Sequence, residues 1–219
     1  MRFWIFWLFA TGASPMALAG KKDQPSLSSE EAGAELYRLR EEMDGLAKRT
    51  QWAGVERAYA RMLQLQVPLT THSHYTAALA AEARGDMRES WVRLVRALRE
   101  QASPEMVGPD GGVFIENTLP EVVDVDSESG QAARAAYDQL RTRYGRVQIT
   151  VHKTRLPALI RVGAKPFSKT ERGAIERGQR SLSARFEYAG LLPVGRYMVD
   201  GEFFEVQAGE VYEVKVSKR

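Results

Sequence analysis

The fold of the N-terminal half is decided by residues 71–99, which read THSHYTAALAAEARGDMRESWVRLVRALR. Apolar residues recur at helical spacing in the first part of this stretch, and the same spacing resumes after an interruption at Gly85-Asp86. These apolar positions are Tyr75, Ala78, Leu79, Trp91, Leu94, Val95 and Leu98. The pattern predicts two amphipathic helices joined by a tight turn, which suggests a binding module and reveals no reaction.

An upstream segment carries the same pattern. Residues 51–65, QWAGVERAYARMLQL, align with residues 86–100 at an offset of 35 residues. The aligned pairs are Val55 with Ser90, Tyr59 with Leu94, Met62 with Ala97, and Leu63 with Leu98. An offset near this value is typical of stacked helix-turn-helix units, none of which can bury its apolar face alone.

Residues 85–90, GDMRES, followed by Leu94 and Ala97-Leu98, resemble the second-helix signature of the tetratricopeptide repeat. Pro68 and Pro104 lie near the positions where that family often ends a repeat. The chain departs from the family pattern at His74, Ala81 and Glu42, where the family prefers Trp, Tyr and Leu. The resemblance covers about a third of the chain, and two unrelated but similar helical hairpins remain the alternative.

The resemblance implies a set of groove-lining residues on the first helix of each repeat. In the first repeat these are Tyr37, Arg40, Glu41, Asp44 and Lys48. In the second repeat they are His72, Tyr75, Thr76, Leu79 and Glu82. Aromatic, charged and small side chains together would suit an extended peptide or a partner's helix. The alternative is that two repeats form too short a groove, so that these residues are ordinary surface.

The first 19 residues have the three regions of a secretory signal peptide. Arg2 precedes the apolar run FWIFWLFA of residues 3–10, and Ala17-Leu18-Ala19 supplies a small-x-small cleavage pattern before Gly20. The apolar run is shorter than the about 20 residues that a spanning helix needs. We therefore expect an exported chain, periplasmic or extracellular, with no transmembrane segment after cleavage. Because the sequence contains no cysteine, this chain would have neither disulfides nor an acylated N-terminal cysteine.

Four helices are expected in a helical-repeat domain of residues 30–101, after a polar leader of residues 20–29. A Ser28-x-x-Glu31 capping box begins the first helix, and breaks fall near Thr50, Pro68 and Gly85. Residues 102–129 form an acidic segment broken by proline and glycine, interpreted as a loop or linker. Residues 130–145 return to a helical pattern, interpreted as a third-repeat helix that caps the stack and ends at Gly145.

The pattern of residues 146–219 changes to short alternating runs, which predict a small antiparallel β-sandwich. The expected strands lie near residues 147–151, 159–162, 184–188, 196–199, 203–206 and 211–216. Residues 191–199, LLPVGRYMV, and the later V-x-A-G-E-V of residues 206–211 resemble a PEGA-type or carboxypeptidase-regulatory-like β domain. The name-giving Pro-Glu-Gly-Ala motif is absent, and residues 165–181 read as an insertion.

This insertion, KPFSKTERGAIERGQRS, carries a basic lobe. Its basic residues are Lys165, Lys169, Arg172, Arg177 and Arg180, against Glu171 and Glu176. Such a lobe is suited to an anionic polymer or to the acidic segment of the same chain. The simpler interpretation is a solvated loop with a short helix.

The sequence contains no recognisable catalytic or cofactor motif. It lacks a G-x-S-x-G or S-x-x-K nucleophile motif, a phosphate-cradling glycine loop and an H-E-x-x-H zinc motif. His72-x-His74 lacks the i,i+4 spacing of helical metal ligands, and Asp124-x-Asp126-x-Glu128 lacks the glycine and distal glutamate of a calcium loop. We therefore predict no metal and no cofactor, and the formal net charge of +3 is too small to argue for nucleic acid.

The sequence as a whole predicts an α+β protein, with antiparallel helical hairpins followed by a small β-sandwich. The function that fits best is a non-catalytic binding or scaffolding protein of the bacterial cell envelope, with a protein partner on the helical surface. One alternative is a β module that binds an envelope polysaccharide, with the helices as a spacer. A second alternative is an enzyme with an unrecognised carboxylate site.

Overall fold

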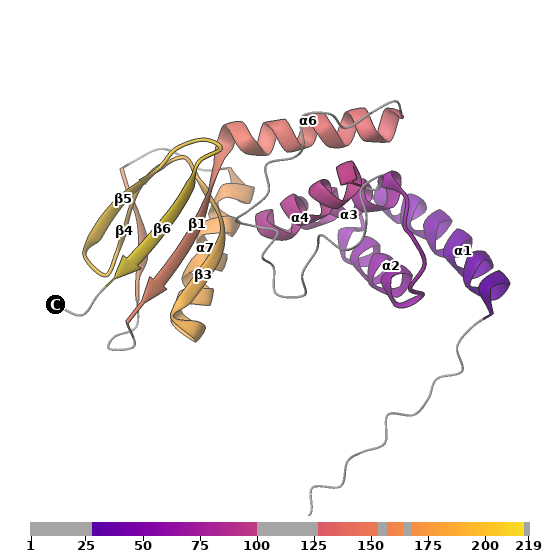
Figure 1. Cartoon of the computed structure of the whole chain (residues 1–219), viewed down its shortest axis with the longest axis horizontal. Helices are drawn as coiled ribbons and strands as arrows, with labels where there is room; N and C mark the ends of the chain where they lie inside the picture. The colour runs from indigo at the N-terminus through magenta and orange to yellow at the C-terminus, as the bar shows by residue number, and fades with distance from the viewer. Residues whose placement is uncertain (1–27, 100–126, 153–156, 164–167, 217–219) are drawn as a thin grey trace, which may run out of the picture.

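The structure is a computed structural model that describes residues 28–99, 127–152, 157–163 and 168–216. The expected signal peptide, most of the polar leader, most of the acidic segment and Lys165 lie outside these ranges. The described residues form an α+β fold, with helices in the N-terminal part and two three-stranded sheets in the C-terminal part. In Figure 1 the first four helices lie at one end of the molecule and the strands at the other.

Two antiparallel helical hairpins make up the first part of the chain. Their helices are α1 (Ser29–Lys48), α2 (Trp52–Gln64), α3 (Thr71–Ala83) and α4 (Met87–Arg99). The predicted capping box begins α1, because the Ser28 hydroxyl accepts from the Glu31 N–H and the Glu31 carboxylate accepts from the Ser28 N–H. Helices α2 and α4 both have 13 residues and begin 35 residues apart, from Trp52 to Met87, which is the predicted offset.

A further helix, α6 (Glu128–Arg143), packs on both α3 and α4 and so covers the end of the second hairpin. Figure 1 shows α6 running from the helical stack to the first strand. The prediction that Gly145 ends this helix is wrong. The helix ends at Arg143, and Tyr144 is already extended and begins β1 (Tyr144–Val151) without a loop. Gly145 instead allows close packing, because a Cβ there would lie 2.5 Å from Val206 Cγ1.

The strands form two small sheets of three strands each. Strand β1 lies between β3 (Glu187–Pro193) and β6 (Val211–Val216), while β4 (Gly195–Val199) lies between β2 (Leu159–Val162) and β5 (Glu202–Val206). All pairs are antiparallel except β1 with β6, which is parallel, so the expected all-antiparallel arrangement is wrong. Residues of both sheets contribute to one apolar cluster that includes Ile149, Tyr197 and Val206.

The interpretation of residues 165–181 as a solvated loop with a short helix is also wrong. A 17-residue helix, α7 (Lys169–Arg185), occupies most of this region and packs on β3. Its buried face consists of Ala174, Gly178 and Leu182, of which Leu182 joins the cluster between the sheets. The strand expected at residues 184–188 therefore starts later, at Glu187, after Phe186 has ended α7 in the left-handed conformation with φ 62°.

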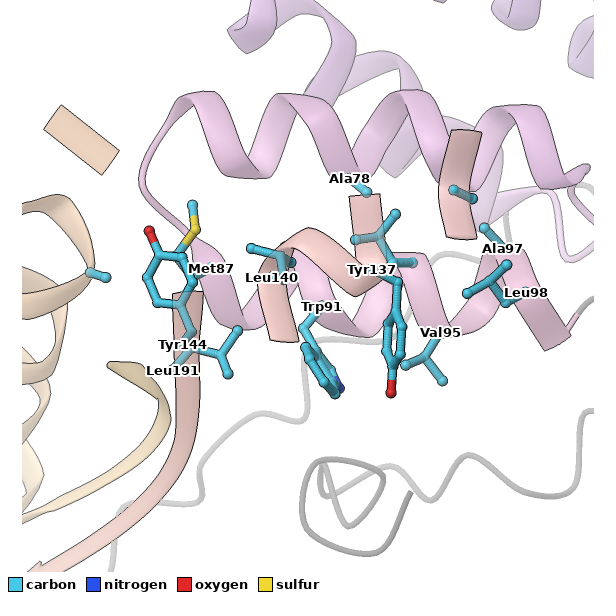
Figure 2. Packing of buried hydrophobic residues seen from close by; sticks show 13 residues of the cluster. Ala78, Met87, Trp91, Val95, Ala97, Leu98, Tyr137, Leu140, Tyr144 and Leu191 are labelled. Atoms are coloured by element: carbon cyan, nitrogen blue, oxygen red, sulfur yellow. The ribbon is translucent and has the colours of Figure 1, made fainter. Parts of the chain in front are cut away.

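A second apolar cluster joins the helices to the strands. Trp91 and Tyr137 lie with ring centroids 4.6 Å apart between α4 and α6. The same cluster includes Tyr144 at the start of β1, Ala174 on α7 and Leu191 on β3. Figure 2 shows Met87, Tyr144 and Leu191 gathered at the end of the cluster nearest the strands. The helical and β parts thus share buried contacts, and their division into separately folding domains stays a prediction.

Candidate functional site

The residues predicted to line a groove come together on the first helix of each hairpin. His72 on α3 lies between two other helices: its Nε2 is 2.8 Å from Asp44 Oδ1 on α1, and its Nδ1 is 3.1 Å from Ser129 Oγ on α6. The residues predicted on α1 recur at helical spacing along one side of that helix, as do those on α3. The hydrogen bonds of His72 therefore connect these sides of α1 and α3 with α6. We call the resulting surface the α1–α3–α6 face.

Most of the predicted residues on the α1–α3–α6 face are accessible. Tyr37 is 67% exposed, and Glu41 and Lys48 are also exposed. The half-buried members are Arg40, Asp44, His72, Tyr75, Leu79 and Glu82. Thr76 is the exception: it is only 5% exposed, so it supports the face from within and is not available to a partner. The face offers one large exposed aromatic ring, Tyr37, and side chains of both charges along α1 and α3.

Tyr75 ties this face to the core beneath it. Its side chain packs against the cluster around Trp91, and burial together with the nearby Glu82 carboxylate raises the pKa of its hydroxyl. The phenol is therefore neutral at physiological pH, and its exposed part presents an uncharged hydrogen-bonding group beside Glu82.

A buried arginine that the sequence analysis did not single out holds three helices together. Arg93 on α4 donates to both carboxylate oxygens of Glu56 on α2, at 2.8 Å each, and to the Ala77 carbonyl on α3 at 2.8 Å. Its Nε also donates to Glu89 at 3.0 Å, and its guanidinium lies 4.7 Å from the centre of the Tyr59 ring. Glu89 and Arg93 at i,i+4 were visible in the sequence, but Glu56 lies on another helix, so only the fold reveals this network.

His74 lies half-buried beside Tyr59, whose ring also contacts Arg93. Its Nδ1 is in hydrogen-bond contact with the Tyr59 hydroxyl at 2.8 Å. Burial, together with the charges of Arg96 and Arg93, lowers the pKa of His74 to about 4. A neutral imidazole in this position is a structural hydrogen-bond partner of Tyr59.

The predicted basic lobe divides between two environments. Lys169, Arg172 and Arg180 on α7 line a hollow of about 490 Å³, together with Arg84 at the end of α3. Arg177 lies apart from them and pairs with Asp86 in the turn between α3 and α4, with Nη1 3.0 Å from Oδ2. Arg84 was not predicted to lie beside the basic lobe, because no local sequence pattern indicates that the end of α3 contacts α7.

The outer side of the sheet β2–β4–β5 carries an exposed apolar row. Ile160 pairs with Met198, and Met198 pairs with Phe203, so the three side chains lie side by side across the strands. Ile160 is 47% exposed and Phe203 is 54% exposed, with the Arg196 guanidinium 4.9 Å from the centre of the Phe203 ring. The sequence analysis named no residue of this surface.

Among the described residues, no three His, Cys, Asp or Glu side chains gather in a way that could hold a metal ion. Within the same ranges, no helix is both long and apolar enough to cross a membrane. Among the residues that line the hollow at α7, Glu176 is the one carboxylate.

Comparisons of this chain with protein-family models, curated proteins and solved structures found no match, so the function proposed below depends on the sequence and the structure of this chain alone.

Proposed function

We propose that the chain is a non-catalytic binding or scaffolding protein of the bacterial cell envelope, which holds a protein partner on the α1–α3–α6 face. The observation that carries this proposal is the position of His72 between Asp44 and Ser129. These two hydrogen bonds join α1, α3 and α6, so the surface includes a third helix beside the first helices of the two hairpins. At a rise of 1.5 Å per residue, the 20 residues of α1 are about 30 Å long.

The chemistry of the face favours an extended peptide or an amphipathic helix as its ligand. Tyr37 supplies a large exposed ring, and tyrosine is enriched among the residues that dominate binding energy at interfaces. Arg40 and Glu41 follow Tyr37 by one helical turn, and Lys48 on α1 and Glu82 on α3 add further charges of both signs, which would select a partner by charge pattern and orient it. The tetratricopeptide resemblance supports this assignment, because proteins of that family bind peptides on the corresponding helices.

An envelope location is supported by the sequence of residues 1–19 alone. Protein from the native host should begin at Gly20, which N-terminal sequencing would check. Recovery of the chain with Met1 intact from the cytosol would contradict both export and an envelope role.

Substitutions on the face test the binding proposal. Tyr37→Ser combined with Leu79→Ser should abolish retention of the partner from an envelope extract, because both remove apolar contact area from the surface. Arg57→Ser is the matched control, since Arg57 is exposed on α2, outside the face. Retention that is equal in both variants, measured by quantitative mass spectrometry, would contradict the proposal.

A second candidate function is supported by the row Ile160, Met198 and Phe203. An exposed aromatic ring on the outer side of a sheet, with Arg196 beside it, is suited to stacking on a sugar ring. In this alternative the sheet binds an envelope polysaccharide and the helices act as a spacer. Phe203→Ser should then abolish sedimentation with insoluble cell-wall polysaccharide, while Tyr37→Ser should leave it unchanged.

A further inference from the structure

A hollow of about 490 Å³ lies between the end of α3 and residues 169–180 of α7. The charged and polar side chains that line it are Arg84, Lys169, Thr170, Arg172, Glu176 and Arg180. We propose that this cationic pocket binds a multiply charged anion of the phosphate class, carried either by a small molecule or by a polymer. The site is independent of the α1–α3–α6 face.

The two walls of the cationic pocket are fixed against each other. The backbones of Gly85 and Gly173 are in close contact, so that a Cβ atom added to Gly85 would lie only 3.1 Å from Gly173 Cα. Arg177 pairs with Asp86 beside this contact, with Nη1 3.0 Å from Oδ2. A pocket whose walls are already positioned loses little free energy to ordering when a ligand enters.

The charge in the pocket is strongly positive. Lys169, Arg172, Glu176 and Arg180 recur at helical spacing along one side of α7, and Arg84 faces them from α3. Four cations and one carboxylate therefore converge on the same space. Lys169 and Arg172, which are three residues apart on the helix, repel each other, and a bound anion would relieve that repulsion.

These cations are available to a ligand. Within the described ranges, no ion pair joins Lys169, Arg172 or Arg180 to a carboxylate. Arg84 has a long contact of 3.7 Å to Glu56 and is 55% exposed. The acidic residue at the start of α7, Glu171, is already engaged in the capping box with Ser168 and with Arg143 at 3.6 Å.

The residue types favour phosphate over a single carboxylate. The planar guanidinium of arginine matches two phosphate oxygens at once, and three of the four cations are arginines. A single carboxylate would neutralise one of the four cations, whereas a phosphate or diphosphate offers several charged oxygens to all of them. The Thr170 hydroxyl adds an uncharged hydrogen-bonding group at the wall of the pocket.

Calorimetric titration of the full chain with pyrophosphate at fixed ionic strength tests the site. We expect saturable binding, and a rise in Tm of about 5–10 °C at a hundredfold excess over Kd. The variant Arg172→Gln/Arg180→Gln should raise Kd by about tenfold or more, because each charge-assisted contact is lost. The matched control is Arg185→Gln, an exposed residue at the other end of the same helix, which should change Kd less than twofold, an order-of-magnitude bound for a distant charge.

Three outcomes would overturn the proposal: the absence of saturable binding, an equal loss of affinity in Arg185→Gln, or equally tight binding of a carboxylated polymer such as polyuronate. If the double variant does not fold by circular dichroism, Lys169→Gln takes its place with the same expectation. Comparison of pyrophosphate with long-chain polyphosphate then separates the two sources, since a polymer site should bind the longer anion more tightly.

Discussion

Ser90 is a polar residue on the buried side of α4. It is 1% exposed, and its hydroxyl has no hydrogen-bond partner among the described residues. Alanine at this position removes the buried hydroxyl and has a higher helix propensity. Ser90→Ala should therefore raise the free energy of unfolding by about 1 kcal/mol and Tm by about 2–4 °C.

Ser181 provides the comparison for this substitution, because its hydroxyl donates to the Glu187 carbonyl at 2.8 Å. Ser181→Ala should lower the free energy of unfolding by about 0.5–1.5 kcal/mol, offset in part by helix propensity. Thermal melting of both variants checks the pair. A lower Tm for Ser90→Ala would mean that the Ser90 hydroxyl is satisfied in the folded chain.

His74 should make the stability of the fold depend on pH. Burial lowers its pKa from 6.5 to about 4, so between these values the unfolded chain binds a proton that the folded chain does not. Its contribution is complete above pH 6.5 and falls by up to about 3 kcal/mol as the pH decreases to 4. Urea denaturation of the wild type and of His74→Gln from pH 8 to pH 4 measures this loss.

The glutamine variant keeps a hydrogen-bonding group near the Tyr59 hydroxyl but cannot titrate. The wild type should therefore lose more stability than His74→Gln over this interval, since all other titrating groups are shared. If the free energy of unfolding decreased by the same amount in the wild type and in His74→Gln, protonation of His74 would not destabilise the folded chain.

At the scale of helices, Arg93 joins α4 to both α2 and α3. Its removal leaves the Glu56 carboxylate, which is 17% exposed, without its bidentate partner. Arg93→Met should cost about 3–5 kcal/mol, and adding Glu56→Gln should recover part of that loss. Arg93→Lys should be intermediate, because lysine cannot donate to both oxygens of Glu56 and to the Ala77 carbonyl in one plane. Equal stability of Arg93→Met and the wild type in urea would exclude the network as a stabilising feature.

A helix or strand can be predicted from the sequence when local features of the sequence determine it. The first four helices follow from a 3.6-residue apolar period and from the Ser28 capping box, both of which are local features. Helix α7 was missed because only Ala174, Gly178 and Leu182 face the core, and two internal glycines lower its helix propensity. The Ser168-x-x-Glu171 capping box was the signal that could have found it.

Features that depend on contacts between distant segments were less predictable. The parallel pairing of β1 with β6 joins residues 146–151 to 211–216, and no local pattern encodes it. Asp44 and His72, which are hydrogen-bonded to each other, were both among the residues predicted to line the groove. Arg84 in the cationic pocket and Glu56 beside Arg93 could only be found from the fold.

Across the whole molecule, two clusters determine how separable the parts are. The cluster between the sheets lies entirely within residues 147–216, so a fragment of residues 145–219 has a complete core of its own. Removing the helices exposes Leu191 and Ala174, which the full chain buries. We expect the fragment to melt cooperatively, with mixed α/β circular dichroism and a Tm below that of the full chain. A disordered fragment would mean that the halves cannot fold apart.

The binding proposal makes a claim about position on the molecule, and site-specific photocrosslinking in the native host tests it most directly. A photoreactive phenylalanine analogue at Tyr37 reports on the α1–α3–α6 face, one at Arg57 reports on α2, and one at Phe203 reports on the outer side of the sheet. The account predicts one discrete protein adduct from position 37 and none from positions 57 and 203. An adduct from position 203 alone, or no adduct from position 37, would contradict it.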